Sequence, residues 1–232
     1  MNGLDLFSGI GGIGIGLSQS VRTVAYCEQD RYAQGVLLSR MRSGDIDAAP
    51  IWDDVTTLRG EMLPRIDIIS GGFPCQDISV AGRGAGLEGK RSGLFYEICR
   101  LTRELRPRFV FLENVPAITV RGLDQVGLAF AEMGYDCRWT TISAASVGAP
   151  HKRERWFLLA HAMRKGLERH RKKSVRNAQE FGYACDNSWW ATEPNVGRVA
   201  DGVQNRAHRI RCLGNSVVPL QVTEAFKILS NI

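Results

Sequence analysis

Short apolar runs alternate with amphipathic stretches over the first two thirds of the chain. Runs rich in β-branched and aromatic side chains predict buried strands at residues 4–7, 21–27, 66–70 and 109–112. Amphipathic stretches predict helices at residues 31–41, 94–105 and 123–133, and two more strands are expected near residues 137–143 and 156–160. Strands that alternate with helices indicate an α/β fold with a doubly wound, mostly parallel sheet.

The pattern changes after His161. Basic side chains crowd residues 164–176 and two tryptophans follow, which is not typical of an α/β core. An amphipathic helix is expected again at residues 220–229. We therefore predict a main domain over residues 1–161, a small inserted segment over residues 162–206, and a C-terminal part over residues 207–232 that returns to the main domain.

A glycine-rich loop follows the first predicted strand. The residues from Gly9 to Gly14 fit the Gly-x-Gly-x-x-Gly pattern between a strand and a helix, where glycines let the backbone approach a nucleotide closely. Glu28 ends the second predicted strand, where a carboxylate can accept the ribose hydroxyls of an adenosine-type cofactor. NAD and S-adenosylmethionine both carry such a ribose. Phe7, placed just before the glycines to stack on adenine or meet a sulfonium, favours S-adenosylmethionine, as does the lack of any obvious hydride chemistry.

Cys75 follows the predicted strand at residues 66–70. Two glycines end this strand, and Pro74 fixes the backbone immediately before the thiol. Open α/β sheets do their chemistry at the carboxyl ends of their strands, so this position favours a presented nucleophile. The alternative is a small buried apolar side chain, which is the usual place of a free cysteine.

Three further charged residues fit a site at the same sheet edge. Glu113 directly follows the wholly apolar run at residues 109–112 and is a candidate acid. Arg153 and Arg155 alternate, so on an extended chain they share a face and can grip a phosphate or a base carbonyl. A salt-bridged surface glutamate and a solvated charged edge are the alternatives.

These groups suit methylation at carbon 5 of cytosine. A thiolate that adds to carbon 6 turns the ring into an enamine, and a protonated glutamate at nitrogen 3 polarises the ring for this addition. Carbon 5 then attacks a sulfonium methyl, and loss of the carbon 5 proton lets the thiol leave. The base must first be flipped out of a duplex.

With these residues assembled, the chain resembles the DNA (cytosine-5) methyltransferases. The matching segments, in family order, are Asp5-Leu6-Phe7-Ser8-Gly9-Ile10-Gly11-Gly12, Pro74-Cys75-Gln76, Glu113-Asn114-Val115, Arg153-x-Arg155 and Gly214-Asn215-Ser216-Val217-Val218-Pro219. The resemblance covers nearly the whole chain. It implies a Rossmann-like, S-adenosylmethionine-dependent methyltransferase fold, with S-adenosylhomocysteine as the product of the cofactor.

The resemblance also implies a role for each matched position. Cys75 is expected as the nucleophile, Glu113 as the residue at nitrogen 3, and Arg153 and Arg155 as the grip on the flipped cytosine and the catalytic loop. Residues 82–93 are expected to form a mobile loop that closes on DNA. The expected cofactor-binding residues are Phe7, Ser8, Gly9, Gly11, Gly12, Glu28, Asp54, Val55, Pro74, Leu94, Asn215 and Ser216. Asp54 rests on Asp53-Asp54-Val55-Thr56, which resembles the third motif of the family, and Asp53 is the alternative register.

Two departures from the family are visible. His151 stands where the family often has glutamine. The interval that houses the target-recognition domain in this family is short here, so residues 162–206 are expected to form a reduced recognition segment that contacts mainly phosphates. We expect a short or relaxed target site.

Composition limits the remaining possibilities. The formal net charge of +6 favours a polyanionic partner without identifying it, and the resemblance implies that the partner is double-stranded DNA. No long apolar run predicts a membrane span, and the N-terminus lacks the pattern of a signal peptide. The cysteines form no Cys-x-x-Cys pair, so we expect neither a metal site nor disulfides. A cytoplasmic monomer of bacterial or phage origin is the default expectation.

Three alternatives stay open from the sequence. The first is a non-catalytic nucleic-acid-binding module of the same fold, which has no need of Cys75, Glu113 or Arg153. The second is a nicotinamide-dependent oxidoreductase, supported only by the glycine loop and Glu28. The third is an RNA cytosine methyltransferase, because the catalytic chemistry is the same.

Overall fold

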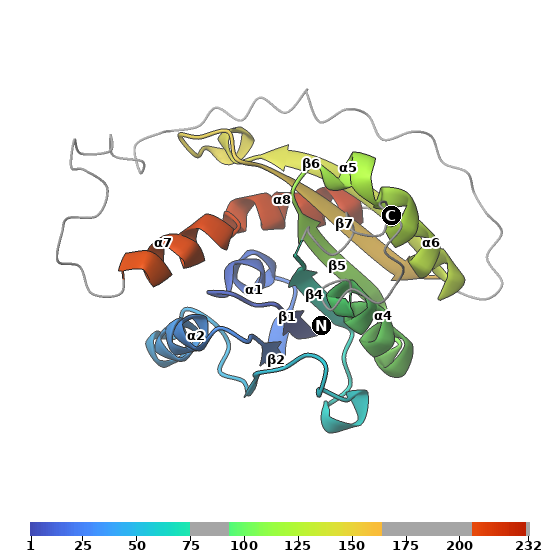
Figure 1. Ribbon diagram of the computed structural model, residues 1–232, viewed down its shortest axis with the longest axis horizontal. Coiled ribbons are helices and arrows are strands. Elements are labelled where there is room, and N and C mark those ends of the chain that lie inside the picture. The colour runs from blue at the N-terminus through green and yellow to red at the C-terminus, as the bar shows by residue number, and fades with distance from the viewer. Residues whose placement is uncertain (75–92, 164–205, 231–232) are drawn as a thin grey trace.

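The computed structural model describes residues 1–74, 93–163 and 206–230. The predictions for Cys75, for residues 82–92 of the expected loop and for most of the inserted segment lie outside these residues. The described chain forms a seven-stranded sheet in the order β3-β2-β1-β4-β5-β7-β6 (Figure 1). Its strands are β1 Asn2–Leu6, β2 Arg22–Cys27, β3 Ile51–Trp52, β4 Ile68–Gly72, β5 Phe109–Asn114, β6 Tyr135–Ser143 and β7 Glu154–Ala162.

The first five strands in chain order pair in parallel, which confirms the doubly wound α/β fold expected from the sequence. The last two strands differ, since β7 pairs antiparallel with both β5 and β6. Because β7 lies directly beside β5, the start of β7 meets the end of β5, where Asn114 pairs with Trp156. The residues that follow β5 and those that precede β7 therefore gather at one edge of the sheet.

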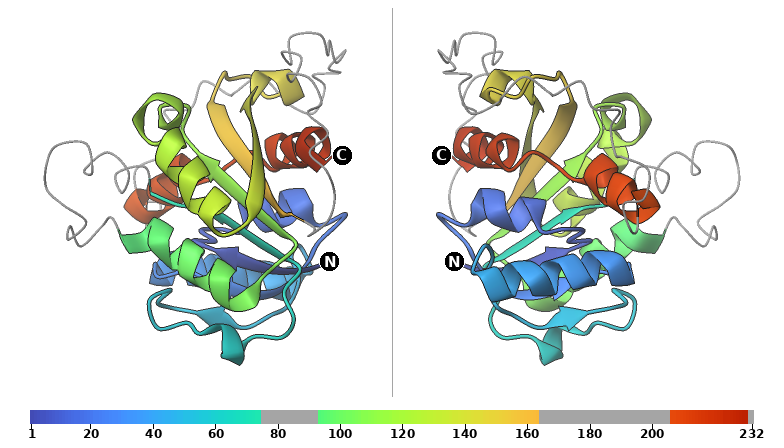
Figure 2. Two further views of the ribbon diagram at one scale, coloured as in Figure 1. Left: turned by 90° about the vertical axis from the view of Figure 1, so that its right-hand side faces the viewer. Right: turned by 90° about the vertical axis from the view of Figure 1, so that its left-hand side faces the viewer.

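Helices cover both faces of the sheet (Figure 2). On one face, α4 and α6 pack on a core that includes Phe95, Ile98 and Phe130. On the other face, α1 and α8 pack on a second core that includes Phe111 and Phe226. The helices are α1 Gly12–Leu17, α2 Arg31–Ser43, α4 Gly93–Leu105, α5 Ile118–Arg121, α6 Leu123–Glu132, α7 Arg206–Asn215 and α8 Pro219–Ser230, with short 3-10 turns at Gly60–Met62 and Ala145–Val147.

The C-terminal helix packs closely against α1, far away in sequence. A Cβ atom at Gly16 would lie 2.5 Å from the carbonyl oxygen of Pro219, so only glycine lets the two backbones approach this closely. The Thr223 hydroxyl donates a hydrogen bond of 2.7 Å to the Gly16 carbonyl oxygen. As a result, residues that precede α8 are held beside the glycine loop that precedes α1.

Within the described ranges, no helix combines the length and apolar character that crossing a bilayer requires.

Candidate functional site

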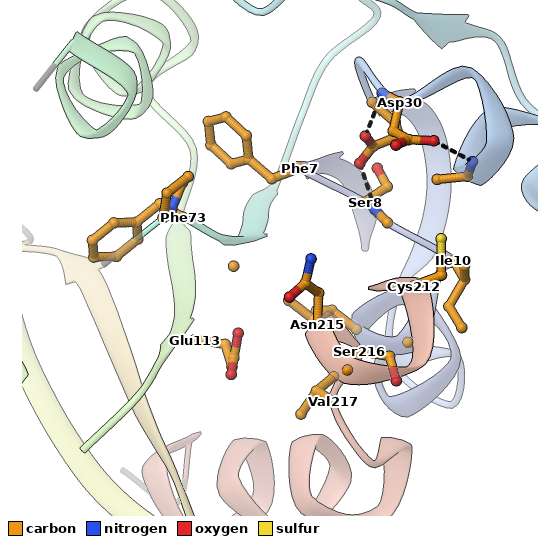
Figure 3. A pocket seen from close by; sticks show the side chains of 18 of the residues that line it. Phe7, Ser8, Ile10, Asp30, Phe73, Glu113, Cys212, Asn215, Ser216 and Val217 are labelled. Atoms are coloured by element: carbon orange, nitrogen blue, oxygen red, sulfur yellow. Dashed lines mark hydrogen bonds between the residues drawn. The ribbon is translucent and has the colours of Figure 1, made fainter. Parts of the chain in front are cut away.

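A cavity of about 470 Å³ opens at the carboxyl ends of β1, β2, β4 and β5 (Figure 3). The segment that joins α7 to α8 closes its remaining side. Ten of the residues predicted for catalysis or cofactor binding line this cavity, namely Phe7, Ser8, Gly9, Gly12, Glu28, Pro74, Glu113, Arg155, Asn215 and Ser216. The fold therefore brings residues from both ends of the chain into one site.

The loop after β1 turns tightly into α1. Three of its residues have positive φ angles, 52° at Phe7, 54° at Gly9 and 86° at Gly11. The Ser8 hydroxyl donates to the carbonyl oxygen of Asp5 at 2.7 Å, which braces the turn. A positive φ is costly for a side chain as large as that of Phe7, so the turn stores strain at the mouth of the cavity.

Glu28 is fixed by the backbone rather than by another charged side chain. One carboxylate oxygen accepts the Gly9 N–H and the other accepts the Asp30 N–H, both at 2.7 Å. Each carboxylate oxygen has a second lone pair, so both can also accept a ligand hydroxyl. This arrangement fits the predicted role of Glu28 as the acceptor of two ribose hydroxyls.

The α7 helix, which the sequence pattern did not predict, covers the cavity beside the start of α2. Its Arg211 lies 3.4 Å from a carboxylate oxygen of Asp30, and its His208 ring stacks on the Tyr32 ring at a centroid distance of 5.4 Å. Sequence reasoning missed Asp30, Arg211 and Cys212 as lining residues. The place of Asp30 could have been predicted from the sequence, because an aspartate before a helical stretch is a typical N-cap. In the structure its side chain accepts the Tyr32 and Ala33 N–H groups at the start of α2.

Glu113 and Arg155 form a nearly buried ion pair. The Arg155 Nε atom lies 2.8 Å from Glu113 Oε1, and the two side chains are only 13% and 12% exposed. Burial raises the pKa of Glu113 to about 7, although the charges of Arg155 and Arg153 oppose this shift. A carboxyl group with this pKa exists in both protonation states near neutral pH, so it can donate a proton or hold one.

Gly72 at the end of β4 makes room for this carboxyl group. A Cβ atom at Gly72 would lie 2.6 Å from Glu113 Oε2. On the next residue of β5, the Asn114 amide donates to the Phe73 carbonyl oxygen at 3.0 Å and accepts the Val115 N–H at 2.8 Å. Asn114 thereby ties the end of β5 to the segment that leads to Pro74.

Arg153 is not a lining residue of the cavity, but its side chain contacts the backbone of two residues that are, Gly214 and Ser216. Its guanidinium donates to the carbonyl oxygens of Gly214 and Ser216, at 2.6 and 2.5 Å. Arg153 therefore ties the start of β7 to the last turn of α7 and to the segment that follows it. The expected grip of Arg153 on a base stays a prediction, and its contacts in the structure are to the protein backbone.

Four predicted cofactor-binding residues lie away from the lining of the cavity. Gly11 caps α1, and Leu94 packs against the core beneath α4. The exposed Asp54 carboxylate accepts the Thr56 N–H and hydroxyl, contacts that lower its pKa. The Val55 side chain is buried in the core. Their roles toward a cofactor remain predictions.

In the part of the chain that the structure describes, no three histidine, cysteine, aspartate or glutamate side chains come together to hold a metal ion.

Known proteins resemble this chain in sequence. The model of the C-5 cytosine-specific DNA methylase family matches residues 1–188. The type II methyltransferase M.CviJI of Paramecium bursaria Chlorella virus IL3A is 37% identical over 225 residues, which are 96% of this chain and 58% of that protein. M.HhaI of Haemophilus parahaemolyticus is 34% identical over 161 residues, 67% of this chain and 47% of that protein.

A solved structure resembles the chain as well. It is that of a putative DNA modification methyltransferase encoded within an E. coli prophage, with a TM-score of 0.58 and 28% identity. The similarity covers 70% of this chain and 47% of that one. The chain thus spans about half the length of the proteins it matches. Since the family model covers most of its residues, the chain belongs to the family of C-5 cytosine-specific DNA methylases.

Proposed function

We propose that this protein transfers the methyl group of S-adenosylmethionine to carbon 5 of cytosine in double-stranded DNA. The observation that carries the proposal is the Glu113–Arg155 pair, which opens into the same cavity as the glycine loop and Glu28. A buried acid with a pKa of about 7 fits the proton donor at nitrogen 3 of the base, and an anchored hydroxyl acceptor fits the binding of the methyl donor.

The residues of the cavity fit S-adenosylmethionine. Glu28 keeps lone pairs free for the two ribose hydroxyls, and the tight turn at Gly9 lets the backbone approach the ligand. Asn215 and Ser216 would form the opposite wall. When bound, the cofactor supplies an electrophilic methyl group on a sulfonium. In this role the protein orients the ligand and excludes water, since the cavity is walled on several sides by the sheet edge and the C-terminal segment.

Cys75 is proposed as the nucleophile. It follows Pro74, which lines the cavity, and Asn114 ties the chain just before Pro74 to β5. Its thiolate sulfur forms a bond to carbon 6 of the flipped cytosine, and the electron pair of the ring's 5,6 double bond becomes available at carbon 5. Carbon 5 would then take the methyl group as its bond to the sulfonium sulfur breaks, which leaves S-adenosylhomocysteine. A base would remove the carbon 5 proton, and the bond between carbon 6 and the Cys75 sulfur would break as the double bond re-forms and the thiolate is released.

Glu113 is proposed to hold the proton at nitrogen 3 of the cytosine. A carboxyl group with a pKa of about 7 is about half protonated at neutral pH, whereas an ordinary glutamate is almost fully ionised there. A proton donated to nitrogen 3 draws electrons from the ring and favours addition at carbon 6. Arg155 orients the carboxyl group through its 2.8 Å contact with Glu113 Oε1.

Target recognition is proposed to rest on residues 162–206, with residues 1–161 and 207–232 forming the catalytic and cofactor-binding part. So small an element can read few base pairs directly, so a short or relaxed target site is expected. A monomer that works in the cytoplasm of a bacterium, encoded by the cell or by a phage, completes the proposal.

One experiment tests this function. Plasmid DNA is incubated with the purified protein and labelled S-adenosylmethionine, and bisulfite sequencing then locates every modified cytosine. Label in DNA and methylated cytosines within a short motif are expected. Failure to label DNA by a protein that binds the cofactor would overturn the proposal, and a strict site of six or more base pairs would overturn the reduced recognition segment.

Cys75→Ala is the control for the mechanism. The variant should lose methyl transfer altogether, because no thiolate can add to carbon 6, while calorimetry should show nearly unchanged binding of S-adenosylhomocysteine. A variant that still turns over would contradict the covalent step.

A further inference from the structure

Gln221 is a fully buried amide in the first turn of α8, on a face of the helix that otherwise carries apolar side chains. Its side-chain nitrogen donates two hydrogen bonds of 2.8 Å, one to the carbonyl oxygen of Ile142 and one to that of Arg153. Its side-chain oxygen has no partner in the described part of the chain. Burying an amide costs free energy unless its polar atoms are hydrogen-bonded, and among the described residues only the nitrogen is. A glutamine at this position therefore calls for an explanation in terms of the two bonds that its nitrogen donates.

The two acceptors of Gln221 identify what it holds. Ile142 pairs across the β6–β7 hairpin with Arg155, the arginine that contacts Glu113. Arg153 immediately precedes β7. The amide therefore grips both strands of the hairpin at the end that carries the site arginines.

Arg153 makes the opposite connection. Its guanidinium donates to the carbonyl oxygens of Gly214 and Ser216, in the cavity wall that leads into α8. A side chain of α8 thus bonds to the hairpin backbone, while a side chain of the hairpin bonds to the backbone before α8. We call this pair of contacts the Gln221–Arg153 lock.

We propose that Gln221 is a positioning residue, which makes the cofactor-facing wall at residues 214–217 and the Glu113–Arg155 pair a single rigid unit. The proposal rests on the proposed function. Its consequence is that a ligand seated against Asn215 and Ser216 also fixes Arg155 for its contact with Glu113. Small losses of alignment in such a unit cost rate steeply, because reacting groups must meet within a fraction of an ångström.

The test compares Gln221→Met with Tyr135→Phe. Methionine matches the size of glutamine but donates no hydrogen bond, so both carbonyl oxygens lose this donor. Tyr135→Phe is the matched control, because its hydroxyl also is buried and donates to a single backbone carbonyl, that of Pro107, away from the lining of the cavity. Three quantities are measured in each: the affinity for S-adenosylhomocysteine, kcat and KM on plasmid DNA, and the pH dependence of kcat.

Gln221→Met should lower kcat/KM by about tenfold and weaken cofactor binding severalfold, beyond any effect of Tyr135→Phe. We expect the kcat of the wild type to fall as pH rises through the Glu113 pKa, because Glu113 then loses its proton. Gln221→Met should move this fall to higher pH. In the described chain, Glu113 faces the charges of Arg155 and Arg153 from the β7 side and uncharged Gly72 from β4. An Arg153 that drifts away no longer opposes the upward shift of the Glu113 pKa. Tyr135→Phe should change only the thermal midpoint.

Equal behaviour of the two variants in all three measurements would overturn the proposal. Should Gln221→Met fail to fold, Arg153→Lys tests the other half of the lock, since lysine keeps the charge but lacks the planar guanidinium whose Nη2 atom donates to both carbonyl oxygens. It should change the same quantities in the same direction, and a wild-type profile would overturn the proposal. An inactive wild-type protein would instead contradict the proposed function, and the cofactor affinities of the variants would still test the lock.

Discussion

Two of the carboxylates that line the cavity, those of Glu28 and Glu113, are held in opposite ways. Glu28 lies between the N–H groups of Gly9 and Asp30, neutral donors that belong to the backbone. Glu113 lies against a guanidinium in a nearly buried position, and its pKa rises to about 7. One carboxylate is built as a fixed acceptor and the other as a group that exchanges a proton. The same residue type thus serves binding at one end of the cavity and chemistry at the other.

The elements behind the two carboxylates differ as well. Glu28 directly follows β2 in the parallel part of the sheet, while Glu113 lies where parallel β5 meets antiparallel β7. The antiparallel neighbour is what brings the start of β7, with Arg155, beside the end of β5. If β7 ran parallel to β5, its carboxyl end would lie beside the end of β5. Arg155, near the start of β7, would then lie at the opposite edge of the sheet.

Of the substitutions that test the two carboxylates, Glu113→Gln should have the largest effect on activity. The amide cannot exchange a proton, so kcat should fall by roughly a hundredfold or more while the affinity for S-adenosylhomocysteine stays near that of the wild type. Single-turnover methylation and calorimetry measure the two quantities. A loss of affinity equal to the loss of rate would show that Glu113 serves binding instead.

Glu28→Ala should give the converse pattern. Removing the carboxylate frees the N–H groups of Gly9 and Asp30 and takes away the acceptor for the ribose, so cofactor affinity should fall about ten- to a hundredfold. At saturating cofactor, kcat should change far less. Glu61→Ala, which removes an exposed carboxylate outside the cavity lining, is the control and should leave both constants unchanged. A drop in kcat alone would refute the division of roles.

The carboxyl group of Asp5 differs from those of Glu28 and Glu113, because it is buried but lies outside the cavity lining. Asp5 accepts the Ser70 hydroxyl at 2.8 Å, its other oxygen has no partner in the described chain, and burial raises its pKa to about 7. This pKa exceeds the ordinary value of 3.8, so the folded state holds the proton more tightly than the unfolded state. Stability should therefore fall as pH rises from about 4 to 7.

Asp5→Asn removes this dependence. The variant should gain stability relative to the wild type by about 2–4 kcal/mol more at pH 8 than at pH 4, with kcat unchanged. Urea unfolding at the two pH values checks the difference. An equal stability change at both values would mean that Asp5 titrates normally in the folded protein.

The carboxylates were predictable from the sequence, whereas their partners were only partly so. Glu28 and Glu113 each follow an apolar strand, and the carboxyl end of such a strand faces the site. Arg155 was expected at the site, but its ion pair depends on the antiparallel β7. The backbone contacts of Arg153 depend on the same topology, which local pattern does not specify.

The C-terminal region shows more clearly which features a local sequence pattern does not predict. The α8 helix was expected from its apolar periodicity, but α7 was not, because its Ile210 and Leu213 remain exposed and give no core pattern. Gln221 is a single polar residue in an apolar helix, and only the fold shows that two carbonyl oxygens lie opposite it. The resemblance also implies cofactor roles for Asp54 and Val55, which remain predictions; in the structure Asp54 accepts the Thr56 N–H and Val55 is buried in the core.

The role of Glu113 as a proton donor is tested by the pH dependence of single-turnover methyl transfer, measured for the wild type and Glu113→Gln at saturating cofactor and DNA. The wild-type rate should fall as pH rises through the region of the Glu113 pKa, about 7 in the free protein, because the proton needed at nitrogen 3 is lost. In Glu113→Gln this fall should be absent and the rate low throughout. A variant that keeps the same alkaline fall, or the wild-type rate, would contradict the account.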